Sequence, residues 1–346
     1  MSALSLALKS TCKCPMVFAQ RIAVPCHRQK VNRRFAHQQK YVPRRAMLYV
    51  PGDSEKKIHK ISTLDVDCAV MDCEDGVALN KKKEARETIA SVLSEGKYDF
   101  GRTERGVRCN QVTSGFAEDD FKVLFGAKVV PDLLLVPKVD TVDEMEWIAD
   151  KLKVYLGERQ MGAPLNLIFQ IESAIGLINL HQIILKGLEK SEDGVFHLTG
   201  IMFGSDDFCA NIGASRTLDA YELTYVRQKI VVHAKAYNLQ AIDMVQINFK
   251  DLNALREQSL QGSRMGFTGK QVIHPNQVAV VQTAFSPSEE QIQWATEMIE
   301  AFNEHQKSGK GAFVFRGVMI DMPSVLQARN IVQLVQELDL IPPKQI

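Results

Sequence analysis

The sequence lacks several features that mark broad classes of protein. Its 346 residues include 42 basic and 41 acidic residues, a net charge of +1, which leaves no overall basic field for nucleic acid. No window approaches the roughly 18 uninterrupted apolar residues of a membrane-spanning helix. The seven cysteines lack the paired spacing of structural zinc sites. We therefore expect a soluble globular protein with free thiols and with neither nucleic-acid nor membrane partners.

The N-terminal 46 residues contain no acidic residue at all. They hold ten Lys or Arg together with Ser, Cys and scattered apolar residues, which is typical of a mitochondrial transit peptide. The alternative is a disordered basic tail that binds an anion. Without these ten, residues 47–346 carry 32 basic and 41 acidic residues, a net charge of −9. We assign residues 1–45 to a transit peptide or disordered segment and expect the mature protein in the mitochondrial matrix.

Short apolar runs alternate with helical stretches between residues 46 and 285. Runs that are apolar throughout indicate strands buried on both faces, and their alternation with helices indicates parallel pairing through right-handed crossovers. Eight such runs predict a closed (β/α)₈ TIM barrel over residues 46–285. The runs are 46–50, 68–72, 106–110, 133–138, 165–172, 200–204, 241–245 and 268–273, and helical stretches include 81–93, 142–156, 174–188, 221–237 and 252–261.

A doubly wound open sheet is the alternative fold. It would favour a glycine-rich phosphate loop after the first strand, but the sequence contains neither G-x-G-x-x-G nor G-x-x-x-x-G-K-[ST]. Residues 286–346 are not needed to close a barrel. In this part, 288–307 and 325–338 have helical patterns, and 308–311 (Ser-Gly-Lys-Gly) form a flexible break. We expect a C-terminal helix and lid segment that packs on the barrel flank or closes over an active site, its own or a neighbour's.

Polar residues follow nearly every apolar run, and the active sites of such barrels lie at the C-terminal ends of the strands. Glu172 ends the fifth run and Asp207 follows the sixth, on strands expected about 5 Å apart. Two carboxylates with open positions suit Mg²⁺, which retains water and substrate oxygens among its ligands. We predict that Glu172 and Asp207 bind Mg²⁺, with Asp206 as the alternative to Asp207.

Basic residues at the same end of the barrel indicate anionic ligands. Arg108 lies in an otherwise apolar strand, where an unpaired charge is costly, so we expect a partner. The candidates are a substrate carboxylate, bound by the guanidinium fork, or Glu74 and Asp75. Lys56, Lys57 and Lys60 follow the first strand at helical spacing and suit a phosphorylated cofactor tail, although a solvated lysine face is the alternative.

Short motifs recur at the strand ends across the predicted barrel and in the C-terminal part. They are DCEDGV (72–77), VRCN (107–110), PKV (137–139), QIESA (170–174), FGSDDF (203–208), GASRT (213–217), GFTGKQVIHP (266–275) and MIDMP (319–323). With these motifs the sequence resembles the citrate-lyase-beta-like and malyl-CoA lyase family. The resemblance implies a Mg²⁺-dependent lyase that splits a 3-hydroxyacyl-CoA carrying a second carboxylate into acetyl-CoA and a 2-oxoacid.

The resemblance also implies roles for individual residues. Glu172 and Asp207 would bind the metal, and Arg108 the oxoacid end of the substrate. Asp321 would be the catalytic acid/base on a lid that reaches an adjacent subunit of a homotrimer. The residues in contact with CoA would be Tyr49, Lys56, Lys60, Ile273 and His274.

Several alternatives stay open at this point. The sequence does not distinguish hydrogen from methyl at the hydroxylated carbon, because that pocket involves a few apolar contacts worth roughly 1–3 kcal/mol. The substrate is therefore malyl-CoA or its methyl homologue, and synthase or thioesterase side activities are compatible with the same site. Another Mg²⁺-dependent pyruvate aldolase and a non-catalytic CoA-binding scaffold are the remaining hypotheses.

Overall fold

The computed structural model describes residues 41–308 and 313–338. Most of the predicted transit peptide and most of the predicted 308–311 break lie outside the described residues. None of the described helices is long and apolar enough to cross a membrane.

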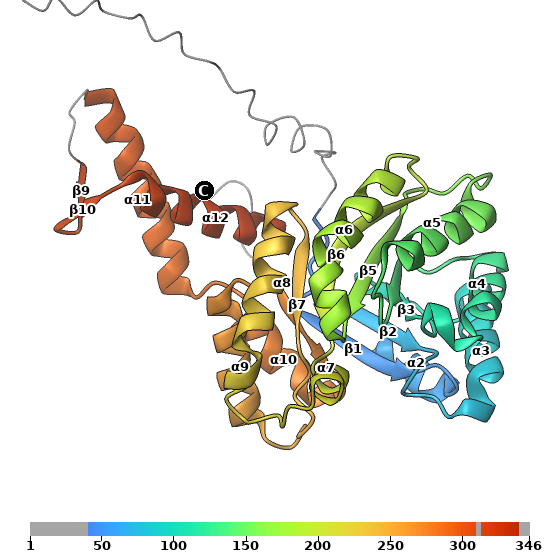
Figure 1. Cartoon of the computed structure of the whole chain (residues 1–346). Helices are drawn as coiled ribbons and strands as arrows, with labels where there is room; N and C mark the ends of the chain where they lie inside the picture. Colours follow the sequence, from blue (N-terminus) through green and yellow to red (C-terminus); the bar gives the residue numbers. More distant parts are fainter. Residues whose placement is uncertain (1–40, 309–312, 339–346) are drawn as a thin grey trace, which may run out of the picture. The chain divides into compact units, whose positions relative to one another are not determined.

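Eight parallel strands, arranged in chain order, close into a barrel (Figure 1). The first strand pairs with both the second and the eighth, which confirms the predicted (β/α)₈ fold. The strands are β1 (Ala46–Pro51), β2 (Cys68–Asp72), β3 (Glu104–Arg108), β4 (Leu133–Val136), β5 (Leu165–Ile171), β6 (Phe196–Phe203), β7 (Gln240–Asp243) and β8 (Gly269–Val272).

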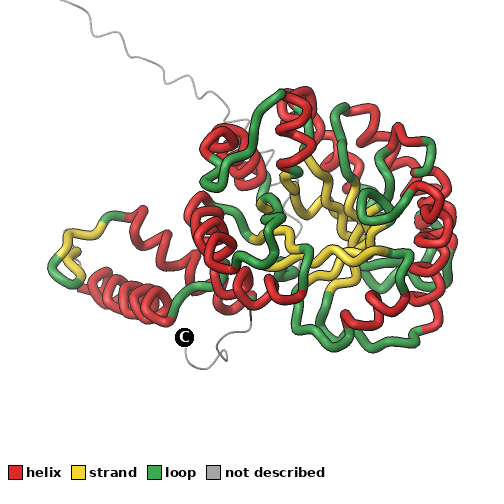
Figure 2. The backbone as a smooth tube through the Cα atoms, turned by 90° about the horizontal axis from the view of Figure 1, so that it is seen from below, coloured by secondary structure: helices red, strands yellow, loops and turns green. Residues whose placement is uncertain are grey.

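Helices surround the strands, as Figure 2 shows from below. Helix α5 (Val142–Leu156) illustrates their origin: Thr141 and Glu144 form a capping box at its start, and Met145, Ile148, Ala149 and Leu152 form its buried stripe. The helices of the barrel are α2 (Glu55–Ile61), α3 (Lys82–Glu95), α4 (Ala117–Gly126), α5 (Val142–Leu156), α6 (Ala174–Ser191), α7 (Ser205–Ile212), α8 (Thr224–Ala236), α9 (Leu252–Met265) and α10 (Pro275–Ala284).

Alternate strand residues fill the barrel interior. Successive side chains of a strand point to opposite faces, so Cys68 and Val70 of β2, two residues apart, both point inward. They belong to a buried apolar cluster, against which Tyr49 of β1 packs. The other fully buried members are Met47, Leu133, Leu135, Ile168, Met202 and Ile242. The interior below the strand ends is therefore a packed core.

Two arginines that we counted in the basic N-terminal segment belong to the barrel. Arg44 is 1% exposed and makes two hydrogen bonds, of 2.5 and 2.6 Å, to the carboxylate of Glu104 on β3. Arg45 is paired in the same way with Asp67, at 2.8 Å. The packed structure thus begins before the boundary at residue 45, because these two charges neutralise buried carboxylates.

The C-terminal part has a small core of its own. Helices α11 (Glu289–Ser308) and α12 (Met322–Glu337) pack together with an antiparallel hairpin of β9 (Phe313–Phe315) and β10 (Val318–Ile320). The hairpin was not expected from the sequence. Its two-residue turn, Arg316-Gly317, has φ of 48° and 80°, which matches the left-handed turns that join twisted strands.

Candidate functional site

A cavity of about 380 Å³ opens at the C-terminal ends of the strands, where a TIM barrel carries its active site. Carboxylates, one arginine and two glutamines surround it, together with small and apolar residues. Its lining consists of Tyr49, Pro51, Asp72, Asp75, Gly76, Arg108, Gln170, Glu172, Gly204, Ser205, Asp206, Asp207, Val245, Gln271 and Ile273.

Arg108, the last residue of β3, lines this cavity. Its Nε and NH2 groups donate to the two oxygens of Asp72 at 2.7 and 2.6 Å, and NH1 is 2.8 Å from Glu74 Oε2. Burial alone would lower the pKa of Arg108, but Asp72 and Glu74 raise it well above the ordinary value. The guanidinium also lies 4.6 Å above the ring of Tyr49, a cation–π contact.

The expected acidic partners of Arg108 are thus partly correct. Glu74 is in direct contact, Asp75 is 3.9 Å away, and the main partner is Asp72, which sequence reasoning missed. Part of the signal was available, since Asp72 ends one predicted run and Arg108 lies within the next, 106–110. In the structure they are the last residues of β2 and β3, and their Cα atoms are register partners. Asp72 also accepts from the backbone N–H groups of Glu74 and Gly76, which fixes the turn after β2.

Glu172, directly after β5, is 4% exposed. Its Oε2 is buried without a hydrogen-bond partner. Burial, together with the nearby carboxylates of Glu74 and Asp207, raises the pKa of Glu172 to about 8. A carboxylate with these neighbours is stabilised by a bound cation.

Asp206 and Asp207 lie in the first turn of α7, a helix that the sequence reasoning did not identify. Arg216 holds Asp206 through a 2.6 Å ion pair, and the same guanidinium donates to the backbone carbonyl of Val245. Asp207 has no arginine partner among the described residues; its Oδ1 is 3.4 Å from Lys138 Nζ. This difference favours Asp207 over Asp206 as the acid that is available to a cation.

Across the described residues, no three His, Cys, Asp or Glu side chains converge as a metal site. The protein can offer a metal the two carboxylates of Glu172 and Asp207, which leaves the other ligand positions to water and substrate. That arrangement is the open coordination typical of Mg²⁺.

The remaining predicted site residues are divided between the cavity and the surface. Tyr49 and Ile273 line the cavity. His274 caps α10 through Nδ1 and stacks on Phe249 with 4.7 Å between ring centroids. Lys56 and Lys60 are exposed on α2 and are not part of the lining. They share one helix face because they are four residues apart.

Asp321 lies outside the cavity of its own barrel. It caps α12, accepting from the backbone N–H and the hydroxyl of Ser324 at 3.1 and 2.7 Å, and these bonds lower its pKa. The cavity lining includes no residue of the C-terminal part that the structure describes. An acid/base role for Asp321 therefore requires movement of this segment or a second copy of the chain.

Two glutamines in the lining were missed by sequence reasoning. Gln271 donates to the carbonyl of Phe203 at 2.7 Å, and Gln170 has a buried side-chain oxygen without a partner. The alternation of side chains along a strand predicts that Gln170 points into the barrel, because Ile168, two residues earlier, does so. An inward polar residue at a strand end is a candidate for substrate contact.

The fold and the cavity define a class: a (β/α)₈ barrel with an acidic pocket at its strand ends and one arginine in the pocket lining. The family model of HpcH/HpaI aldolase/citrate lyase matches residues 45–275, which include all eight strands of the barrel. The chain belongs to this family.

Relatives and solved structures of the family align over most of the chain. Residues of this chain are 53% identical over 295 positions to Citramalyl-CoA lyase, mitochondrial, of Homo sapiens, covering 85% of this chain and 86% of the relative. A (3S)-malyl-CoA thioesterase of Cereibacter sphaeroides is 30% identical over 83% of this chain and 93% of its own length. The crystal structure of CitE from Mycobacterium tuberculosis in complex with magnesium, acetoacetate and coenzyme A has a TM-score of 0.66, 25% identity and coverage of 86% and 100%.

Proposed function

We propose that this chain is a Mg²⁺-dependent mitochondrial lyase that cleaves citramalyl-CoA into acetyl-CoA and pyruvate. The observation that carries the proposal is the buried carboxylate of Glu172, whose Oε2 has no hydrogen-bond partner, beside Asp207 and with Arg108 in the same cavity. The 53% identity to mammalian enzymes with this activity in their names supports the choice of reaction and of compartment. The acid-free basic N-terminal segment supports import into the matrix.

The residues at the cavity fit a magnesium ion. Glu172 is buried, lacks a partner for one oxygen and has two acidic neighbours, so a divalent cation would remove a large electrostatic cost. Glu172 and Asp207 would hold the ion. When bound, it supplies Lewis-acid polarisation of the substrate oxygen that becomes the ketone of pyruvate.

Arg108 binds the carboxylate of the substrate in this proposal. Asp72 fixes the orientation of the guanidinium by two hydrogen bonds, and the arginine remains part of the cavity lining. A preoriented guanidinium loses little freedom when the substrate binds, so its interaction energy is available for positioning. Tyr49 supports the guanidinium from one side and thereby limits where the carboxylate can lie.

Cleavage of the carbon–carbon bond leaves an acetyl-CoA enolate, whose carbon must receive a proton. We assign this proton transfer to Asp321 on the C-terminal lid, which acts in the site of an adjacent subunit of a homotrimer. The location of Asp321 outside its own cavity supports action in trans. Lys56, Lys60, Ile273 and His274, with Tyr49, form the proposed contacts to CoA; the lysines suit its phosphates.

Malyl-CoA is the second candidate substrate, because a relative at 30% identity is named for hydrolysis of malyl-CoA. The test is side-by-side kinetics of the purified full-length chain with citramalyl-CoA and malyl-CoA in Mg²⁺, measuring acetyl-CoA, the 2-oxoacid and free CoA. A higher kcat/KM for citramalyl-CoA, with pyruvate as product, supports the proposal. A higher value for malyl-CoA assigns the second function, and free CoA without acetyl-CoA assigns a thioesterase.

A further inference from the structure

Lys138 has an unusual backbone conformation at the edge of the acidic cavity. Strand β4 ends at Val136, and after Pro137 the chain adopts φ of +51° at Lys138, in the left-handed region that residues other than glycine seldom occupy. The next residue, Val139, donates its N–H to the carbonyl of Gln170 at 3.3 Å, so the chain is tied to β5 immediately after the turn. Strained positions of this kind are concentrated at functional sites.

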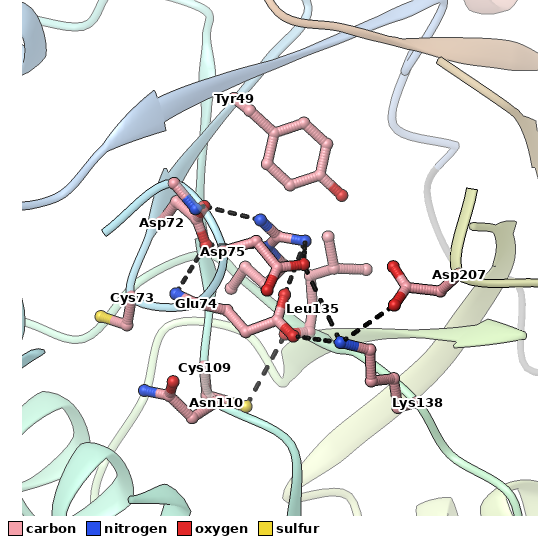
Figure 3. Close-up of polar contacts among 12 residues, drawn as sticks. Tyr49, Asp72, Cys73, Glu74, Asp75, Cys109, Asn110, Leu135, Lys138 and Asp207 are labelled. Atoms are coloured by element: carbon pink, nitrogen blue, oxygen red, sulfur yellow. Dashed lines mark hydrogen bonds and ion pairs between the residues drawn. The ribbon is translucent and has the colours of Figure 1, made fainter. Parts of the chain in front are cut away.

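The side chain of Lys138 points into a group of carboxylates from two other strand ends (Figure 3). Its Nζ donates to Glu74 Oε1 at 3.0 Å and lies 3.9 Å from Asp75 Oδ2 and 3.4 Å from Asp207 Oδ1. Within residues 41–308 and 313–338, Lys138 is the one ion-pair partner of Asp207. Of the carboxylates at the site, Asp206 is paired with Arg216, whereas Asp72, Glu74, Asp75, Glu172 and Asp207 have two cations among them, Arg108 and Lys138.

The contacts of Lys138 with Glu74 and with Asp207 differ in kind. The distance to Glu74 is that of a hydrogen bond, whereas 3.4 Å to Asp207 is an ion pair without one. A magnesium ion binds a carboxylate oxygen at about 2.0–2.1 Å. A divalent ion on Asp207 and an ammonium group beside the same carboxylate repel each other, and the hydrogen bond to Glu74 gives the ammonium a partner other than Asp207.

We propose that Lys138 is a resident counter-cation of Asp207, one that competes with the divalent ion and sets its affinity. This inference rests on the proposed metal role of Asp207. In the metal-free chain Lys138 neutralises Asp207 and Glu74; when the metal binds, it releases Asp207 and remains on Glu74. The charge of Lys138 therefore weakens metal binding, and its removal tightens it.

The test is Mn²⁺ binding to the full-length chain, followed by the loss of the free-ion signal in electron paramagnetic resonance. Lys138→Gln keeps a hydrogen-bond donor for Glu74 without the charge, and we expect it to lower the Kd for Mn²⁺ by about tenfold. Lys138→Arg, which retains the charge, should stay near wild type. Lys151→Gln is the matched control, because Lys151 is 29% exposed against 26% for Lys138 and is likewise paired, with Glu118 at 2.6 Å. Unchanged or weaker Mn²⁺ binding by Lys138→Gln would overturn the inference.

A second measurement needs no variant. Amine-reactive labelling of wild-type chain, analysed by peptide mass spectrometry, should be faster at Lys138 with Mn²⁺ than without it, and unchanged at Lys151. A rate at Lys138 that is unchanged or lower with Mn²⁺ contradicts displacement from Asp207. Both readouts are independent of turnover, so failure of the lyase assay alone leaves this inference intact. If instead Glu172→Gln binds Mn²⁺ as tightly as wild type, both the proposed metal site and this inference are overturned.

Discussion

Asp72 and Arg108 are register partners at the ends of β2 and β3, and two hydrogen bonds of 2.7 and 2.6 Å join their side chains. The pair is almost fully buried, with side chains 2% and 11% exposed. Only a planar guanidinium can satisfy both carboxylate oxygens and still present an N–H to a substrate. The geometry of this part of the cavity lining therefore depends on an arginine at this position.

Arg108→Lys should impair both kcat and KM for the CoA substrate, because a lysine cannot reproduce the fork. Hydrogen bonds to charged groups contribute about 1.5–3 kcal/mol each, so we expect kcat/KM to fall at least about tenfold. Steady-state kinetics are the measurement. Arg105→Lys is the control: Arg105 lies on the same strand as Arg108 but outside the cavity lining, and it makes the same kind of bidentate contact, with Asp132. Its change should leave the kinetics unaltered. Equal kinetics for both variants would make Arg108 a structural residue.

Glu172 should make the metal-free protein less stable as pH rises. Its folded-state pKa of about 8 lies above the ordinary value near 4.5, so between these values the folded chain holds a proton that the unfolded chain has lost. The contribution of Glu172 to the free energy of unfolding is complete below pH 4.5 and is lost as pH rises through about 8. Each unit of difference between the folded and unfolded pKa corresponds to about 1.4 kcal/mol of this free energy. Urea unfolding in chelator across this range measures the slope.

Two comparisons identify Glu172 as the source of that slope. Glu172→Gln should flatten the profile and stabilise the metal-free chain near pH 8, whereas the same change at the exposed Glu118 should not. Saturating Mg²⁺ should restore stability at high pH, because the metal binds the ionised carboxylate. A wild-type profile that rises between pH 5 and 8 in chelator would contradict the environment described for Glu172.

Gly204→Ala tests the space around the metal ligand. A Cβ at Gly204 would lie 2.7 Å from Cδ and Oε1 of Glu172, so the carboxylate must move. The backbone itself, with φ of −92°, accepts alanine. We expect Mn²⁺ affinity to fall about tenfold, as for other changes that disturb the orientation of a ligand. Gly126→Ala, which meets no atom within 4 Å, is the control, and equal affinities in the two variants would show that Glu172 does not depend on this glycine.

Sequence patterns were sufficient for the barrel because buried parallel strands are apolar throughout and their polar ends stand out. The same patterns brought Arg108, Glu172 and Asp207 to one end of the barrel, where the structure places all three in the cavity lining. Contacts between strands were harder to predict. The Asp72–Arg108 pair depends on register, and the choice between Asp206 and Asp207 depends on Arg216, which comes from the loop after α7. The β9–β10 hairpin escaped prediction since its strands are only three residues long.

Action of Asp321 in trans predicts complementation between inactive variants. Asp321→Asn and Glu172→Ala chains should each be inactive, and their mixture after subunit exchange should recover a fraction of wild-type activity, because some sites combine an intact metal site with an intact lid. Mixing Glu172→Ala with Asp207→Ala is the control and should recover nothing, since every barrel keeps one defect. No recovery in the first mixture, with exchange verified by native mass spectrometry, would assign the lid to its own barrel.

The central claim is that the carboxylate pair at the strand ends holds the metal that carbon–carbon cleavage requires. The direct measurement is formation of acetyl-CoA and pyruvate from citramalyl-CoA by the full-length chain, in excess chelator and after Mg²⁺ is restored, for wild type and folded Glu172→Gln. We predict that chelation abolishes wild-type activity, that Mg²⁺ restores it, and that Glu172→Gln is inactive in both conditions. Full wild-type activity in excess chelator, or wild-type rates from Glu172→Gln, would contradict the account.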